Sequence, residues 1–406
     1  MKYRLLDFLV CPHCGGTFTM KVLSEEKRDQ ITVSSGVKCG SWCSFYGVSL
    51  NEDQGVIECG MCYRVEIRDG LLECSCGSLF PVVDYIPRIL PDAFHGLHDF
   101  LEKYGHLVLS EKIERQREGK GVESFRRIQG KTKRSFAYEW LRYNVELEKE
   151  DREVFLGDSQ LSKEDFKDKV ILDAGCGMGR YTKVVGIMGR EVVGVDISQS
   201  VVKAYLVTHD NPSIHILQGN ILHLPFREKQ FDIIYSLGVL HHTPNAKQSF
   251  LNLVRYLKHG GFISVWVYGT AGNFSDFKTN PLRKERQHYV KNDIVKRMHW
   301  RMVYVREVFF NTIRLVTTRM YVPLLYLLCY PLAVLGRVPL LKYVTASVHQ
   351  SWRVRVQENF DWLSPQYQSH HTKEEIRDWF REAQVEELSI LPHGFIPKVG
   401  LKGKLR

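Results

Sequence analysis

Short apolar runs alternate with stretches of helical periodicity through the middle of the chain. The runs occupy 170–172, 191–196, 214–219, 231–235 and 260–268, and they suit strands buried on both faces of a parallel sheet. Apolar positions at helical spacing follow Arg180, and 245–258 predicts another helix. Since strands and helices alternate, we expect an α/β fold with a Rossmann-like, doubly wound, mostly parallel sheet of seven strands.

The C-terminal pattern completes this sheet. Thr372 followed by Glu375 predicts a capping box at the start of a helix. Ile376, Trp379 and Phe380 then fall on one helical face. Residues 385–391 suit an edge strand that closes the sheet.

The run at 170–172 leads into a glycine-rich turn, VILDAGCGMGRY at 170–181. Gly175, Gly177 and Gly179 let the backbone approach a ligand, and the N–H groups at the following helix start face it. Asp173, two residues before the first glycine, would repel a pyrophosphate. It suits the ammonium and sulfonium groups of S-adenosylmethionine (SAM). We therefore predict a SAM site here, against the alternative of a glycine turn without a ligand.

Later strand ends supply the other predicted SAM contacts. Asp196 lies 21 residues after Gly175, the distance at which a carboxylate can hold ribose hydroxyls. Asn220 can accept a hydrogen bond from the adenine amino group, and Ile221 offers an apolar face. The predicted set is Asp173, Ala174, Gly175, Cys176, Gly177, Gly179, Asp196, Ile197, Asn220, Ile221, Ser236 and Leu237.

Together these segments resemble class I SAM-dependent methyltransferases, particularly the branch that includes ubiquinone-biosynthesis and natural-product enzymes. The resemblance covers 170–268 and the C-terminus. Enzymes of this layout usually carry Asp at position 220. SLGV at 236–239 stands where amino-group DNA and protein methylators have an N-P-P-Y type tetrapeptide. Methylation of exocyclic amines is therefore disfavoured.

Two adjacent histidines follow the fourth predicted strand. Methyl transfer requires an acceptor to lose a proton, and a positioned general base contributes roughly 10²–10⁴-fold. His241 or His242 could be that base because imidazole titrates near neutrality. The alternative is that one or both pack against or cap the next helix.

Eight of ten cysteines lie within the first 76 residues. They form the pairs Cys11/Cys14, Cys39/Cys43, Cys59/Cys62 and Cys74/Cys76. The charged N-terminus lacks the pattern of a secretory signal, which favours metal binding in a reducing compartment. We predict one or two structural zinc sites, with the first and last pairs forming one site and the inner pairs another. A crossed pairing stays open.

LLDFLVCPHCGG and GLLECSCGSLFPVVDYIPRILP resemble the small zinc-ribbon domain that activates tRNA and protein methyltransferases and is often fused to bacterial ones. The match covers 3–91, interrupted by the 39–62 insertion. The C-x-C spacing of Cys74 and Cys76 departs from the commoner pattern of two intervening residues.

Residues 93–168 are charged and predominantly helical in character. Phe136, Trp140 and Tyr143 recur at helical spacing, which indicates a helix packed on the next domain. KTKRSFAYEWLRYN at 131–144 resembles the SF-x-x-x-W segment before the catalytic core of zinc-ribbon-fused methyltransferases. That resemblance implies that Phe136 and Trp140 help to close the cofactor pocket. Lid and core packing are equal alternatives.

The positive charge is concentrated in one segment. Residues 271–360 contain 15 Lys and Arg against 5 Asp and Glu, which accounts for the entire net charge of +10. Residues 320–336 carry no charge. We expect a buried helical hairpin that builds the acceptor pocket. The second interpretation is an interfacial surface at 300–345 that meets anionic headgroups, and the third is an RNA surface.

These features predict five parts: a zinc ribbon (1–92), a helical linker or lid (93–168), the SAM-binding core (169–268), a basic and apolar insert (269–360), and a C-terminal helix with closing strands (361–406). The phrase DWLSP-x-Y…HHT-x-E-E…WF resembles bacterial small-molecule and glycan-modifying methyltransferases, and Tyr367, His370 and His371 line the acceptor side or a surface turn.

The predicted activity is O-methylation, with C-methylation second, of a small-molecule, lipid-linked or glycan acceptor. The alternatives are an RNA methyltransferase and a non-catalytic partner protein. We expect a cytoplasmic protein, either free or peripheral at the inner face of the membrane.

Overall fold

The computed structural model describes residues 1–28, 42–49, 60–107, 120–142, 148–269, 308–338, 345, 347, 349–391 and 398–406. The chain divides into two compact units. The first unit comprises 1–130, 162–235 and 252–262, and the second comprises 131–161, 236–251 and 263–406. Cys39 and Cys59, both predicted zinc ligands, lie outside the described residues.

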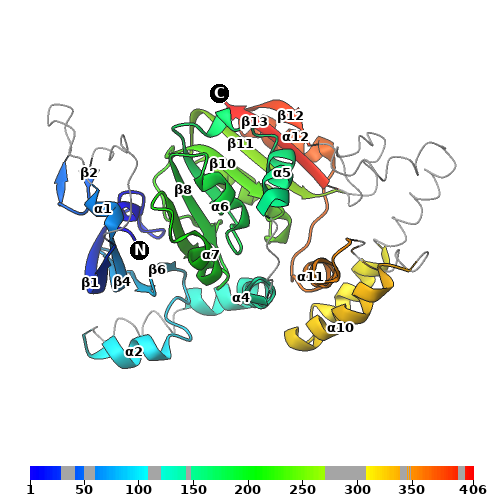
Figure 1. Cartoon of the computed structure of the whole chain (residues 1–406), viewed down its shortest axis with the longest axis horizontal. Helices are drawn as coiled ribbons and strands as arrows, with labels where there is room; N and C mark the ends of the chain where they lie inside the picture. The colour runs from blue at the N-terminus through cyan, green and yellow to red at the C-terminus, as the bar shows by residue number, and fades with distance from the viewer. Residues whose placement is uncertain are drawn as a thin grey trace. The chain divides into compact units, whose positions relative to one another are not determined.

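The first unit contains the N-terminal module and the start of the predicted sheet, with strand order β1-β4-β5-β6-β9-β8-β7-β10. Strands β6, β9, β8, β7 and β10 pair in parallel, whereas β1, β4, β5 and β6 pair antiparallel. Helices α6 and α7 pack on β8 and β9 (Figure 1). The strands are β1 (Phe18–Lys27), β4 (Val65–Cys74), β5 (Leu79–Val83), β6 (Ile86–Ile89), β7 (Val170–Ala174), β8 (Glu191–Asp196), β9 (Ile214–Gly219) and β10 (Phe231–Leu237, whose last two residues belong to the second unit), with a separate pair β2 (Trp42–Cys43) and β3 (Val48–Ser49). The helices are η1 (Tyr3–Asp7), α1 (Met61–Arg64), α2 (His98–Tyr104), η2 (Gly105–Leu107), η3 (Glu164–Phe166), α6 (Arg180–Gly186) and α7 (Val201–Thr208).

The N-terminal module extends the central sheet. Strand β6 pairs with β9 through Arg88 opposite Gln218, and the Arg88 guanidinium donates to Gln218 Oε1 at 3.1 Å. On the other side of the module, the Val10 N–H donates to the Pro225 carbonyl at 2.9 Å. The module and the core of the first unit therefore share one hydrogen-bonded framework.

The second unit contains the strand order β11-β13-β12, with β12 and β13 antiparallel. Its strands are β11 (Leu257–Tyr268, which begins in the first unit), β12 (Val385–Ile390) and β13 (Lys398–Leu405). Its helices are the second half of α4 (Lys120–Arg142), α5 (Glu148–Ser159), η4 (Leu240–His242), most of α8 (Ala246–Val254), a helix at 308–317, α10 (Val322–Leu335), α11 (Trp352–Leu363) and α12 (Lys373–Glu382). Thr372 and Glu375 form the predicted capping box. Four strands of the first unit (β9, β8, β7 and β10) and three of the second (β11, β13 and β12) confirm the predicted α/β fold.

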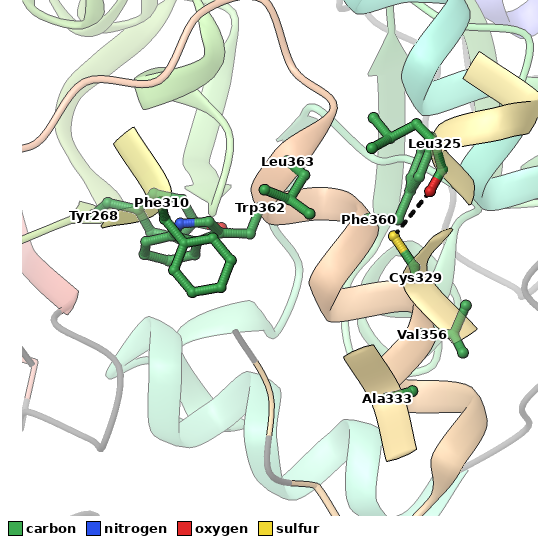
Figure 2. Close-up of a cluster of buried hydrophobic side chains, with 9 residues drawn as sticks. All are labelled: Tyr268, Phe310, Leu325, Cys329, Ala333, Val356, Phe360, Trp362 and Leu363. Carbon is green, nitrogen blue, oxygen red and sulfur yellow. Dashed lines mark hydrogen bonds between the residues drawn. The ribbon is translucent and has the colours of Figure 1, made fainter. Parts of the chain in front are cut away.

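A buried cluster joins α10 and α11 within the second unit (Figure 2). Leu325, Cys329 and Ala333 come from α10, while Val356 and Phe360 come from α11. The cluster also contains Tyr268 at the end of β11, Phe310, Trp362 and Leu363. The apolar segment is thus anchored beside the end of a sheet strand.

Two expectations about element boundaries were wrong. The helix predicted for 245–258 ends at Val254, because the Arg255 and Tyr256 carbonyls accept hydrogen bonds from Lys229 and from Gln230 and Phe231. Residues 320–336 do not form a buried hairpin. Pro323 lies in the first turn of α10, where proline is tolerated, and Pro331 lies inside the helix, which continues as one element to Leu335.

That helix is also only half buried. Its side chains alternate between the cluster of Figure 2 and an exposed face that includes Leu327, which is 63% exposed. Within the described part of the chain, no helix has both the length and the apolar character needed to cross a bilayer.

Candidate active site

The turn after β7 has the backbone conformation that its glycines predict. Gly175, Gly177 and Gly179 have φ angles of 95°, 53° and 84°, a region that L side chains rarely adopt. A side chain at Gly179 would also lie 3.0 Å from the Cα atom of Ala204 on α7. The close approach of α6 and α7 at this turn therefore depends on glycine.

The end of β8 holds the glycine turn. The Gly175 and Cys176 N–H groups donate to the Val195 carbonyl at 2.8 and 3.0 Å, and the Gly177 N–H donates to Asp196 Oδ2 at 3.0 Å. Ser198 donates to the other Asp196 oxygen through its N–H and hydroxyl groups. Burial raises the pKa of Asp196. The Ser200 hydroxyl also donates to Oδ1, at 3.4 Å. Oδ2 accepts only from Gly177 among these donors, so it retains a lone pair for a ligand.

Asp173 lies inside the first unit, with 4% of its surface exposed. The Thr182 hydroxyl on α6 donates to Asp173 Oδ2 at 2.6 Å. Burial raises the pKa of Asp173 to about 7, while hydrogen bonds from Thr182 and Tyr235 act in the opposite direction. Asp173 therefore joins α6 to the end of β7, and its contact with SAM stays a prediction.

The predicted adenine contacts lie in the turn after β9. Asn220 is buried, and its Oδ1 accepts from the Leu222 N–H at 3.0 Å. The Ile221 carbonyl accepts from Asn252 Nδ2 at 2.7 Å. The remaining predicted contact of this unit, Ile197, is fixed through its carbonyl by Gln218 Nε2 at 3.0 Å. These bonds set the backbone of both turns.

The loop after β10 belongs to the second unit and begins with Ser236, which is buried, and Leu237. Gly238 follows with a φ of 79°. Its N–H donates to the Trp266 carbonyl at 3.1 Å, and a side chain there would lie 2.8 Å from the Trp266 ring. This tight turn leads into η4, which carries the two predicted catalytic histidines.

His242 is buried and oriented by a backbone group. Its Nδ1 lies 3.1 Å from the Tyr367 carbonyl oxygen. A carbonyl can only accept, so Nδ1 carries the proton and Nε2 presents its lone pair. Nε2 lies 3.9 Å from Asp361 Oδ1. Burial lowers the pKa of His242 to about 3, partly offset by the hydrogen bond to Tyr367, so the ring is neutral at pH 7.

His241 has a different environment. Its side chain is fully buried, and neither ring nitrogen has a hydrogen-bond partner among the described residues. Its ring centroid lies 3.9 Å from that of Tyr268 and 4.0 Å from that of His242. Burial, followed by the neighbouring His242, lowers its pKa well below the usual value. His241 is held by ring packing, whereas His242 is held by a directed hydrogen bond.

Asp361 connects this pair to the end of β11. The Tyr268 hydroxyl donates to Asp361 Oδ2 at 3.1 Å. Burial raises the pKa of Asp361 to about 6, and the Tyr268 hydrogen bond opposes that rise. The carboxylate therefore becomes ionised in the weakly acidic range, beside a neutral imidazole.

Glu139 and Arg314 are two further polar residues of this unit. Gln357 donates to buried Glu139, and burial together with the charge of Asp361 raises the pKa of Glu139 well above its usual value. Arg314 donates to the carbonyls of Trp362 and Pro365 at 2.6 and 2.9 Å.

Four polar residues of this unit were not predicted from the sequence: Asp361, Tyr268, Glu139 and Arg314. One available signal was an acidic residue beside a tryptophan, as in DW at 361–362 and EW at 139–140.

The predicted lid residues lie on α4, in the second unit. The Phe136 ring is 5.2 Å from the His242 ring in an edge-on arrangement. Phe136 and Trp140 are both partly buried. Phe136 therefore belongs to the histidine cluster, and a contact of either residue with SAM stays a prediction.

The residues of the first unit fit SAM by their chemistry. Asp196 Oδ2 retains one lone pair that can accept from a ribose hydroxyl, and the second lone pair of Asn220 Oδ1 can accept from an amino group. Two carboxylates, Asp173 and Asp196, flank the glycine turn, which favours a ligand with a positive charge over a pyrophosphate. These assignments stay predictions for each residue.

Four cysteines form a cluster in the N-terminal module. The ligand atoms of Cys11, Cys14, Cys74 and Cys76 all lie within 4.8 Å of one another, and the Sγ atoms of Cys11 and Cys76 are 3.7 Å apart. Tetrahedral zinc with sulfur ligands at about 2.3 Å separates the sulfurs by about 3.8 Å. The structure brings the two outer pairs together with a geometry that is compatible with zinc, and their role as metal ligands stays a prediction.

The turns that present these thiols are alike. In the first, the Gly15 N–H donates to the Cys11 carbonyl at 2.8 Å, and in the second, the Gly77 N–H donates to the Cys74 carbonyl at 2.9 Å. Both glycines have positive φ angles. The inner site is described only in part: Cys43 and Cys62 are both buried beside Tyr63.

Comparison with known proteins agrees with this geometry. A family described as "Methyltransferase domain" matches residues 172–265. The chain is 33% identical over 99 residues to a ubiquinone biosynthesis O-methyltransferase of Rickettsia bellii, which covers 24% of this chain and 41% of that protein. It is 38% identical over 103 residues to a tRNA (carboxymethyluridine(34)-5-O)-methyltransferase of Arabidopsis thaliana, covering 24% of each chain.

A third relative, a phthiotriol/phenolphthiotriol dimycocerosates methyltransferase of Mycobacterium tuberculosis, is 22% identical over 145 residues, covering 32% of this chain and 51% of that protein. The chain thus spans between about a quarter and a half of these relatives. The three names differ in acceptor and agree in methyl transfer. Residues 172–265 form a class I, SAM-dependent methyltransferase domain.

Proposed function

We propose that the chain transfers a methyl group from SAM to a hydroxyl oxygen of a small acceptor, either free or carried on a lipid or glycan. A carbon nucleophile activated by loss of a proton is the less favoured form of the same reaction. The observation that carries this proposal is the pair formed by His242 and Asp361, because it supplies a neutral imidazole with a defined lone pair beside a carboxylate.

SAM, when bound, supplies a methyl group on a positively charged sulfur. In the proposal, Asp196 and Asn220 hold the cofactor, on a backbone turn that the glycines permit. His242 Nε2 takes the acceptor proton while Nδ1 stays bonded to the Tyr367 carbonyl, so the ring does not rotate as it becomes charged.

Asp361 supports that charge. An imidazolium is stabilised beside an ionised carboxylate, so in the proposal Asp361 offsets part of the burial that lowers the pKa of His242. Tyr268 positions Asp361 through its hydroxyl. General-base help of this kind accounts for roughly 10²–10⁴-fold, and the remaining acceleration comes from alignment of the acceptor.

Two experiments test the proposal in sequence. Isothermal titration of the zinc-loaded chain should give stoichiometric SAM binding, and absence of binding would refute the enzyme assignment. Mass spectrometry then compares lipid and metabolite extracts of cells with and without the protein. We expect species lighter by one methyl group in the deficient cells. SAM binding with no methylated species in any extract would favour a non-catalytic partner.

A second candidate is an RNA acceptor, favoured by the Arabidopsis relative, whose name specifies tRNA, and by the basic segment. It is tested by measuring binding to total tRNA between 50 and 200 mM salt. Phosphate contacts would make the affinity fall steeply with salt, whereas a small-molecule enzyme would show weak binding. Methyl incorporation into RNA would replace the primary proposal.

A further inference from the structure

Helix α10 is apolar on every side, although half of it faces outward. Its exposed side chains are large: Leu324 is 49% exposed, Leu327 63% and Val334 66%. Helices that are apolar all round are normally buried completely or lie in lipid. We call this surface the apolar face, and define it by Tyr321, Leu324, Leu327, Leu328, Tyr330 and Val334.

The opposite side of α10 fixes the orientation of the apolar face. Leu325, Cys329 and Ala333 are buried against Val356 and Phe360 of α11 (Figure 2). The Cys329 thiol also donates to the Leu325 carbonyl at 3.3 Å. Because α10 is packed along this buried side, the helix cannot turn its exposed leucines inward without giving up the cluster. The exposure is therefore a property of the folded unit.

Other exposed apolar side chains occur on the elements that flank α10 in the sequence. The helix at 308–317 exposes Leu315 and Val316, at 63% and 64%. At the other end, the Tyr330 ring lies 6.0 Å from the ring of Trp352, which is 51% exposed. Exposed apolar patches of this kind mark interaction sites, and tyrosine and tryptophan are enriched where protein meets the headgroup layer of a membrane.

The charge of the segment selects the kind of partner. Residues 308–357 contain no Asp or Glu and six Lys and Arg, of which Arg314 and Arg355 are buried. Arg319 and Arg337, which flank α10, are exposed, and the Arg353 guanidinium lies 5.6 Å from the Trp352 ring centroid. Exposed leucines together with exposed arginines suit a bilayer surface, which has an apolar interior and anionic headgroups.

We propose that the apolar face docks on an anionic lipid bilayer, with α10 lying along the surface. Spanning is excluded for this helix, because its 14 residues reach about 21 Å against a hydrocarbon core of about 30 Å. A nucleic acid would leave the leucines in water, since the face presents few groups to phosphates. The proposal is independent of methyl transfer.

The test is cosedimentation of the full chain with vesicles, without SAM or acceptor, so its result is separate from that of the proposed function. We expect binding to vesicles of phosphatidylglycerol and phosphatidylcholine, and at least tenfold weaker binding to phosphatidylcholine alone. The double variant Leu324→Ser/Leu328→Ser should weaken the binding roughly tenfold or more, because about two leucine side chains are lost from lipid. The matched control is Ile187→Ser/Leu206→Ser, which removes side chains that are 69% and 62% exposed in the first unit.

A second double variant, Arg319→Glu/Arg337→Glu, tests the role of charge and should abolish the preference for phosphatidylglycerol. Arg381→Glu on α12 is its control. Thermal unfolding verifies that the variants remain folded. Binding that is unchanged by both double variants would overturn the proposal. A second result would also overturn it. If the chain does not bind vesicles but self-associates with increasing concentration in the ultracentrifuge, and Leu324→Ser/Leu328→Ser removes that self-association, the apolar face is an interface between copies of the chain.

Discussion

The Tyr268 hydroxyl donates a hydrogen bond to Asp361 Oδ2 at 3.1 Å, while the other oxygen of the same carboxylate lies 3.9 Å from His242 Nε2. One carboxylate thus links the last residue of β11 to the histidine of η4. This arrangement holds Asp361 on the side of His242 opposite to the Tyr367 carbonyl contact. We therefore expect the charge of Asp361 to influence how well His242 can accept a proton.

The first prediction concerns pH. Burial raises the pKa of Asp361 to about 6, so the carboxylate loses its charge as the pH falls through that value. Methyl transfer should therefore decline below about pH 6 and level off above it. Asp361→Asn should lower kcat at neutral pH by about tenfold or more and remove this acidic limb. The measurement is kcat against pH from 5 to 8. If the decline of kcat at acidic pH is the same in Asp361→Asn, it is caused by the titration of another group.

The second prediction separates the two histidines. His242→Phe should lower kcat by roughly 10²–10⁴-fold, the range expected for loss of a general base. His241→Phe replaces a ring that is held by packing and should retain most of the activity. SAM affinity, measured by titration, should be unchanged in both. The reverse order of kcat losses would identify His241, whose nitrogens have no described partner, as the base.

The third prediction concerns the cofactor. Asp196 accepts from the Gly177 N–H and from Ser198, so Asp196→Ala removes both the support of the glycine turn and the predicted ribose acceptor. SAM affinity should fall at least tenfold in calorimetric titration. Asp210→Ala, at a side chain that is 92% exposed, is the control and should bind SAM normally. Equal affinities of the two variants would contradict the role assigned to Asp196.

The local parts of this site were predictable because short patterns determine them. Alternate glycines after Leu172 specify a turn with positive φ angles, and Cys11 with Cys14 specifies a metal-binding turn. Asp361 and Tyr268 are 93 residues apart in the chain and Glu139 and Gln357 are 218 apart, and no local pattern pairs them. The orientation of α10 could not be predicted either, because its apolar residues occur on every side of the helix and do not indicate which side is buried.

The fourth prediction concerns the metal. The Cys11, Cys14, Cys74 and Cys76 thiols are grouped tightly enough for one tetrahedral ion. Cys14→Ser should remove one equivalent of zinc, measured by atomic emission, and lower the unfolding temperature, as should a strong chelator. Ser78→Ala is the control, because its hydroxyl contacts Cys76 Sγ at 3.2 Å and His13 Nδ1 at 2.9 Å but supplies no sulfur ligand. Full zinc content in Cys14→Ser would exclude this cluster as the metal site.

The fifth prediction concerns the docking of the N-terminal module in the first unit. The Arg4 guanidinium donates to both oxygens of Glu191 at 2.8 Å, and Glu191 on β8 has no exposed surface. Arg4→Met leaves that carboxylate buried without its cation, which typically costs about 3–5 kcal/mol. Arg68→Met is the control: its partners lie at 3.6 and 3.7 Å on the surface, where the expected loss is at most about 1 kcal/mol.

The pH dependence of this loss identifies its cause. Burial alone would raise the pKa of Glu191, but the Arg4 hydrogen bonds and charge, with His215, lower it below its usual value of 4.5. The wild-type ion pair therefore stabilises the fold above pH 4.5, and this contribution disappears as the pH falls through the depressed value. In Arg4→Met the same carboxylate has a raised pKa, so its penalty is present at neutral pH and vanishes when it is protonated. Urea unfolding at pH 7 and pH 5 should show the stability gap between the two proteins narrowing on acidification. A gap that is equal at both values would mean that Arg4 acts through packing on Phe8, 4.7 Å from its ring centroid, and not through charge.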